Sequence, residues 1–219
     1  MSRFFDAVRS GDVDTMQALA EAEPAVVSSR DERGIDAYMA ARYARQTQAA
    51  DWLLGHGFVC DVFSAAVAGN AARLTELLTQ DSSLATGYSS DGWTALHLAA
   101  FFGSGSAAQA LVAAGAKVNA RSRNAMQNAP LHAAAAGKSL EVVRLLLANG
   151  ADVNANQEGG WTALHATAQN GDTEIALLLI SLGARVKATA NNGQTPLDLA
   201  LTGGRAEMVN LLDAHGASD

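Results

Sequence analysis

The sequence predicts an all-α repeat solenoid, in which similar helix–turn–helix units stack along one axis. One phrase recurs: G-W-T-A-L-H-L-A-A at 92–100, A-P-L-H-A-A-A at 129–135, G-W-T-A-L-H-A-T-A at 160–168 and G-Q-T-P-L-D-L-A at 193–200. The threonine position of this phrase falls at Thr94, Ala129, Thr162 and Thr195. At one constant distance after each of these a glycine follows, at Gly115, Gly150, Gly183 and Gly216. Such a nearly fixed period is typical of stacked repeats, whose units contact only their neighbours.

Each copy reads as two helices. The threonine hydroxyl can accept from an orphan N–H at the start of the inner helix, and Pro130 and Pro196 occupy a first position where no N–H is needed. The second helix of the fifth copy, 140–147, is apolar on nearly all sides, which predicts packing on more than one face. The closing glycine suits a left-handed helix end. The leucines expected to point into the stack are Leu96, Leu131, Leu164 and Leu197.

A period of about 33 residues with the phrase T-P-L-H-x-A is the signature of ankyrin repeats. The chain resembles that family over nearly its whole length. The resemblance implies an ankyrin-repeat stack with short β-hairpin loops, called fingers, between successive copies. It also implies that His97, His132 and His165 hydrogen-bond to backbone and to the threonine, tying one repeat to the next. A single domain, 1–219, is expected, with approximate repeats at 1–33, 34–57, 58–91, 92–126, 127–159, 160–192 and 193–219.

The first three copies are degenerate. The segments 1–33 and 58–91 share one frame of apolar residues and glycine, and 36–57 forms the copy between them. Only F-V-C separates Gly57 from Asp61, so the finger between copies two and three is expected to be missing or cut to a turn. The last copy has a polar outward helix, as a terminal repeat needs, so the stack is expected to end there.

Composition narrows the classes of partner and location. The chain of 219 residues has a net charge of −7 and a pI near 5.1, which disfavours nucleic acid as a partner. Cys60 is the single cysteine, so no internal disulfide is possible, and no apolar run reaches the ~20 residues of a membrane span. We therefore expect a cytoplasmic protein that binds neither nucleic acid nor membrane.

Motifs that suggest chemistry have structural explanations here. The histidines recur once per repeat at a position that the fold explains, which disfavours a catalytic or metal role. The stretch 103–108 matches G-x-G-x-x-A, but an expected helix precedes it where dinucleotide binding needs a strand. Cys60 has no C-x-x-C partner and reads as a structural thiol. The sequence therefore predicts no catalytic residues, no metal site, no cofactor and no enzyme.

A non-catalytic scaffold for protein–protein interaction, expected to be a monomer, is the predicted function. By analogy with ankyrin stacks, another protein would bind the concave face and the fingers, where Trp, Tyr and Arg are typical of interface hot spots. Three alternatives stay open for these residues: the tryptophans pack against a neighbouring finger, one phenylalanine turns into the stack, or the arginines form a solvated tip. For the chain, the alternatives are a structural or self-associating array and, less favoured, a small-molecule binder or enzyme. The candidate partner-binding residues are Tyr88, Trp93, Phe101, Phe102, Arg121, Arg123, Met126 and Trp161.

Overall fold

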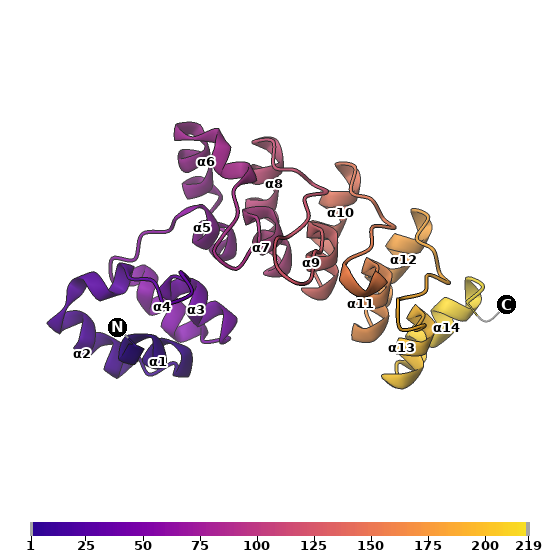
Figure 1. Ribbon diagram of the computed structural model, residues 1–219, viewed down its shortest axis with the longest axis horizontal. Coiled ribbons are helices and arrows are strands. Elements are labelled where there is room, and N and C mark those ends of the chain that lie inside the picture. The colour runs from indigo at the N-terminus through magenta and orange to yellow at the C-terminus, as the bar shows by residue number, and fades with distance from the viewer. Residues whose placement is uncertain (1, 218–219) are drawn as a thin grey trace.

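The computed structural model describes residues 2–217, and within them helices follow one another in antiparallel pairs (Figure 1). The inner helices are α1 Ser2–Ser10, α3 Ala37–Tyr43, α5 Val62–Ala68, α7 Ala95–Phe101, α9 Pro130–Ala136, α11 Ala163–Asn170 and α13 Pro196–Thr202. The outer helices are α2 Val13–Ala22, α4 Thr47–Gly55, α6 Ala71–Gln80, α8 Gly105–Ala113, α10 Leu140–Ala148, α12 Thr173–Ser181 and α14 Ala206–Ala214. Short 3-10 turns are η1 Pro24–Ser28, η2 Ser82–Thr86 and η3 Glu158–Gly160. The all-α repeat stack is thus confirmed, whereas the exact repeat boundaries stay a prediction.

The recurring phrase starts the inner helices as expected. The Thr94 hydroxyl accepts from the His97 N–H at 3.3 Å, and the Thr195 hydroxyl accepts from the Asp198 N–H at 3.2 Å. In the degenerate copies an aspartate takes this place, and the Asp36 carboxylate accepts from the Met39 N–H at 2.7 Å. Such caps satisfy backbone donors that the helix itself leaves free.

Small residues let the inner helices lie close together. α7 packs against α9, α9 against α11 and α11 against α13. The paired alanines at these contacts are fully buried: Ala99, Ala100, Ala134 and Ala135. Of the four repeated leucines, Leu96, Leu131 and Leu164 are buried, whereas Leu197 is half-buried.

The fingers are simpler than the expected β-hairpins. Residues 2–217 contain only isolated bridges, Arg30 to Asp36 and Tyr88 to Thr94, and no longer strands. In the second case the Ser89 N–H donates to the Trp93 carbonyl at 2.8 Å, and Gly92 turns the chain with φ of +81°. The Tyr88–Thr94 pair stays single because η2 ends at Thr86 just before it and α7 begins at Ala95 just after it.

The junction between the second and third copies lacks a finger. α4 ends at Gly55 and α5 begins at Val62, and Phe58 between them stacks on Tyr38 with ring centroids 5.8 Å apart. The inner helices α3 and α5 still pack, and Arg30 pairs with Asp61 across the junction at 2.7 Å. Figure 1 shows the outer helix α6 standing well away from α4, so the stack bends here.

Copy five departs from the pattern at Gly137 and Lys138. Lys138 takes the left-handed backbone (φ +57°) that glycine has at the equivalent Gly103 and Gly171. Gly137 itself has an ordinary φ of −79°, but a Cβ there would collide with the Phe101 carbonyl oxygen and lie 2.8 Å from its carbonyl carbon. Gly137 is therefore needed for the close approach of α9 to α7, not for the turn.

We expect Gly137→Ala to destabilise the protein by about 1–3 kcal/mol, because backbone must move to admit one methyl group. Lys138→Gly, the neighbouring control, should instead stabilise it by about 0.5–1 kcal/mol by relieving left-handed strain. Urea unfolding of both variants measures the two signs. A Gly137→Ala protein as stable as the wild type would contradict the contact.

Candidate functional site

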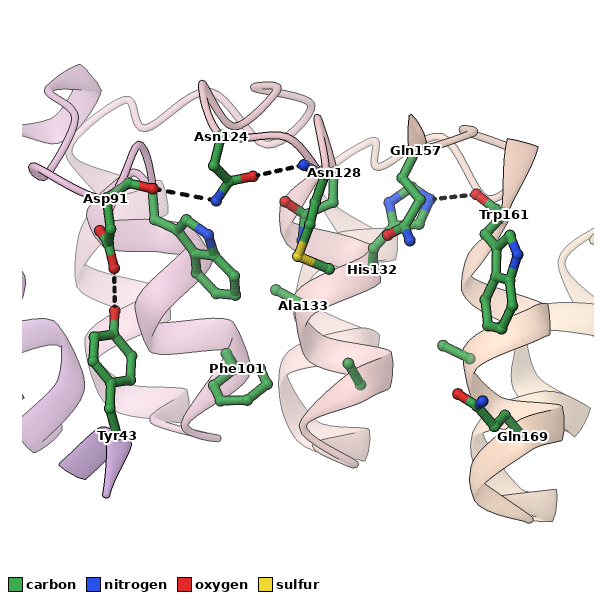
Figure 2. A pocket seen from close by; sticks show the side chains of 14 residues that line it. Tyr43, Asp91, Phe101, Asn124, Asn128, His132, Ala133, Gln157, Trp161 and Gln169 are labelled. Atoms are coloured by element: carbon green, nitrogen blue, oxygen red, sulfur yellow. Dashed lines mark hydrogen bonds between the residues drawn. The ribbon is translucent and has the colours of Figure 1, made fainter. Parts of the chain in front are cut away.

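A cavity of about 490 Å³ opens on the concave side of the stack, between inner helices α7, α9 and α11 and the fingers above them. We call it the central groove (Figure 2). Its lining residues are Tyr43, Asp91, Trp93, Phe101, Asn124, Met126, Asn128, His132, Ala133, Ala136, Gln157, Trp161, Ala166 and Gln169.

Aromatic residues form the two ends of the groove. Trp93 and Phe101 meet edge to face, with ring centroids 5.6 Å apart, and Phe101 is 38% exposed. Trp93 also lies 5.8 Å from His97, and at the other end Trp161 lies 5.7 Å from His165. Between these walls the floor is made of small or buried residues from α9, including Ala133 and Ala136.

Hydrogen bonds within and between neighbouring fingers hold the rim. The Asn124 amide donates to the Asp91 carbonyl at 3.2 Å and accepts from the Met126 N–H at 3.1 Å, as Figure 2 shows. The Glu158 N–H donates to the Met126 carbonyl at 2.8 Å. The exposed Met126 side chain is therefore carried on a backbone that is fixed on both sides.

Tyr43 closes the N-terminal end of the groove from two copies away. Its hydroxyl donates to the Asp91 carboxylate at 2.6 Å, and its ring lies 5.8 Å from that of Phe102. The guanidinium of Arg42 stacks over Phe102 at 5.0 Å and donates to the Val67 carbonyl at 3.4 Å. These contacts join α3 of the second copy directly to α7 and the finger of the fourth.

The repeated histidines are buried links between copies, as the resemblance implies. Their Nε2 atoms donate to the carbonyls of the next finger, for His97 to Asn128 at 2.9 Å, for His132 to Trp161 at 3.2 Å. Burial lowers the pKa of all three imidazoles, and that of His97 falls to about 4, so they are neutral at pH 7. No group of three or more metal-ligating side chains occurs among residues 2–217.

Four of the eight predicted partner-binding residues line the groove: Trp93, Phe101, Met126 and Trp161. Phe102 does not, because it turns toward Tyr43 and Arg42 and is half-buried in that contact.

The remaining three join one finger to the next. The Tyr88 hydroxyl donates to the Arg121 carbonyl at 3.1 Å, and the Arg123 guanidinium stacks 3.9 Å from the Tyr88 ring. Arg121 donates to the Asn156 carbonyl at 2.6 Å. These three side chains are thus engaged in finger packing beside the groove.

Sequence reasoning missed Tyr43, Asn128 and His132 as groove residues. The signal for Tyr43 was its register, since it stands at the same distance from Asp36 as Phe101 does from Thr94. The signal for Asn128 was that it stands in the position of Trp93 and Trp161. The signals for Tyr43 and Asn128 become visible only when the copies are aligned residue by residue.

Comparison with known proteins agrees with this architecture. Over 95 residues the chain is 38% identical to the Neurogenic locus Notch protein of Drosophila melanogaster; the stretch covers 43% of this chain and 3% of that much longer protein. None of the helices within residues 2–217 is long and apolar enough to cross a membrane. Residues 4–157 and 131–218 both match the family described as ankyrin repeats in three copies. The chain therefore belongs to the ankyrin-repeat family.

Proposed function

We propose that the protein is a non-catalytic interaction module that binds another protein through the central groove. The observation that carries this proposal is a preformed apolar groove of about 490 Å³ whose rim is held by finger-to-finger hydrogen bonds. Contiguous apolar surface of this kind marks an interaction site, and tryptophan is enriched where partners bind most tightly. Membership of the ankyrin-repeat family supports a protein as the partner.

The exposed side chains of Phe101 and Met126 give the groove its binding surface. They are 38% and 46% exposed and lie beside the half-buried Trp93, so a partner that covers them removes further apolar area from water. The protein partner would reach the groove from the concave side, with the fingers at its edge. We place this module, as a monomer, in the cytoplasm, a reducing compartment that suits the single unpaired cysteine Cys60.

The double variant Phe101→Asp with Met126→Asp tests the groove. We expect it to keep its helical circular dichroism and to lose the partners that the wild type captures from a lysate of the source cell. Calorimetry with the captured protein, once purified, should show binding weakened by roughly 30-fold or more, as loss of a hot spot implies.

The matched control is Leu177→Asp with Leu182→Asp, which places two carboxylates at apolar positions that are 48% and 53% exposed on and just after outer helix α12. This control should bind as the wild type does. Equal affinity of wild type and groove variant would remove the groove as the binding site. If the groove serves self-association instead, sedimentation across a wide concentration range would show it.

A further inference from the structure

The apolar and aromatic side chains that line the central groove form one row across the inner helices. Figure 2 shows Tyr43, Phe101, Ala133 and Trp161 following one another from α3 through α7 and α9 to the start of α11. Trp93 belongs to the same row, because its ring meets that of Phe101 edge to face. The row crosses several helices instead of following one of them, so a ligand that covers it has to be elongated and lie across the stack.

The two tryptophans of the row carry hydrogen-bond donors that the protein itself does not use. Both side chains line the groove and are half-buried. Within residues 2–217 neither indole N–H of Trp93 and Trp161 has a hydrogen-bond partner, and neither nitrogen is among the buried unpaired atoms, so both reach solvent. Indole nitrogen is a donor only. A ligand that covers these rings must therefore bring acceptors, because a covered donor without a partner is costly.

The acceptors on the rim of the groove are already engaged. The Asp91 carboxylate accepts from the Tyr43 hydroxyl at 2.6 Å, and the Asn124 side-chain oxygen accepts from the Met126 N–H at 3.1 Å. Apart from Asp91, the lining has no charged side chain at pH 7. Because residues 2–217 contain only isolated bridges, no strand edge is open beside the groove to pair with the N–H groups of an extended ligand.

We propose that the occupant of the central groove is a proline-rich segment of the partner in the polyproline II conformation. Its rings pack on the aromatic side chains, and its carbonyls accept from the indole N–H groups of Trp93 and Trp161. The inference rests on the proposed function and names the class of partner. Proline has no N–H to leave unpaired, and a polyproline II segment keeps its carbonyls free of internal hydrogen bonds. An α-helix would instead use its carbonyls within itself and leave both indoles without a partner.

The repeat of such a segment matches the spacing of the stack. A polyproline II helix advances about 9 Å per turn of roughly three residues, and packed helices lie about 8–10 Å apart. Every third proline therefore meets a new copy, first at Trp93 and Phe101, next over the floor that α9 provides, and then at Trp161. We expect the partner to carry prolines three residues apart over about seven positions.

Nonaproline with blocked ends, about 28 Å long in this conformation, is the probe for the full chain. Binding is followed by NMR of the indole N–H signals of Trp52, Trp93 and Trp161. Trp52 stacks on His56 on outer helix α4, away from the groove, and is the internal control. Nonaproline should move the Trp93 and Trp161 signals and leave that of Trp52 in place. A glycine–serine nonapeptide, which has backbone N–H groups and no rings, should bind at least roughly tenfold more weakly.

Two substitutions remove the donors and keep a ring at each site. Trp93→Phe with Trp161→Phe should weaken nonaproline binding by roughly ten- to 100-fold, because each lost hydrogen bond accounts for about three- to tenfold. The matched control is Trp52→Phe, which should leave the affinity unchanged. Melting curves check that the variants are folded.

Nonaproline that leaves the Trp93 and Trp161 signals in place would overturn the proposal, as would unchanged affinity in the double phenylalanine variant. An amphipathic helical peptide with leucine and phenylalanine on one face that binds more tightly than nonaproline would also overturn it, by identifying a helix as the occupant. Any of these results, with partner loss still caused by Phe101→Asp and Met126→Asp, would end this inference and leave the proposed function standing. Nonaproline binding as expected, with partner capture unaffected by that variant, would instead remove the proposed function.

Discussion

The stability gap between the wild type and a His97→Gln variant should shrink by about 3 kcal/mol as the pH is lowered from 7 to 4. His97 is fully buried, and burial lowers the pKa of its imidazole from 6.5 to about 4. Below pH 6.5 the unfolded chain therefore binds a proton that the folded chain does not. The free energy of unfolding that depends on His97 is intact above pH 6.5 and is lost as the pH falls through about 4.

Burial of the ring makes protonation unfavourable in the folded state and lowers the pKa of His97, although the hydrogen bond to the Asn128 carbonyl acts in the opposite direction. Nε2 of His97 donates to the Asn128 carbonyl, so in the neutral ring Nδ1 is the acceptor for the Thr94 N–H at 3.4 Å. Glutamine at 97 keeps a donor and an acceptor without a titrating group, which makes it the appropriate comparison.

The prediction compares the free energy of unfolding of the wild type with that of His97→Gln, because Asp36 changes the stability of both proteins with pH in the opposite direction. Burial raises the pKa of its carboxyl group to about 6, so the folded state takes up that proton first and gains stability as the pH falls from 6 toward 4. Urea unfolding at several pH values, with Asp36→Asn as a control, separates the two effects. Asp36→Asn should lose stability with acid more steeply than the wild type. A gap between wild type and His97→Gln that does not change with pH would show that His97 is not held neutral.

Leu131→Ala should cost about 2–5 kcal/mol, the largest effect that we expect from a single truncation. Leu131 is 1% exposed on α9, which packs against α7 on one side and α11 on the other. Its truncation leaves a cavity that the tightly packed alanines of the neighbouring helices cannot close.

Leu197→Ala is the matched control, because Leu197 has the same position in the last copy but is only half-buried. It should cost less than half as much, since part of the lost side chain was already in water. Urea midpoints with unchanged slopes give both values. Equal losses at the two sites would show that burial within the stack does not set the cost.

Periodicity predicted the fold because each copy carries its own start and stop signals. The closing glycine returns in all four regular copies, the threonine cap in three of them and the proline at the first helical position in two, and each of these is a local feature. A missing finger was also predictable, since F-V-C is too short to form one. Local chemistry therefore sufficed for the order and direction of the helices.

The groove was only half predictable, because its shape depends on what different copies place side by side. Trp93, Phe101 and Met126 are conspicuous in one copy and its finger, and they do line the groove. Phe102 is equally conspicuous but turns to Tyr43, a contact between copies two and four that no single repeat reveals. Asn128 was overlooked because a small polar residue draws attention only when compared with the tryptophans in register with it.

The loss of one finger has an effect on shape that reaches beyond the gap itself. With only residues 56–61 between α4 and α5, the inner helices α3 and α5 still pack while the outer helices α4 and α6 stand apart. Tyr43 can then touch Asp91 across an entire intervening copy. The short connection therefore bends the stack. The bend places the first two copies beside the central groove, where they form a side wall that a straight array would lack.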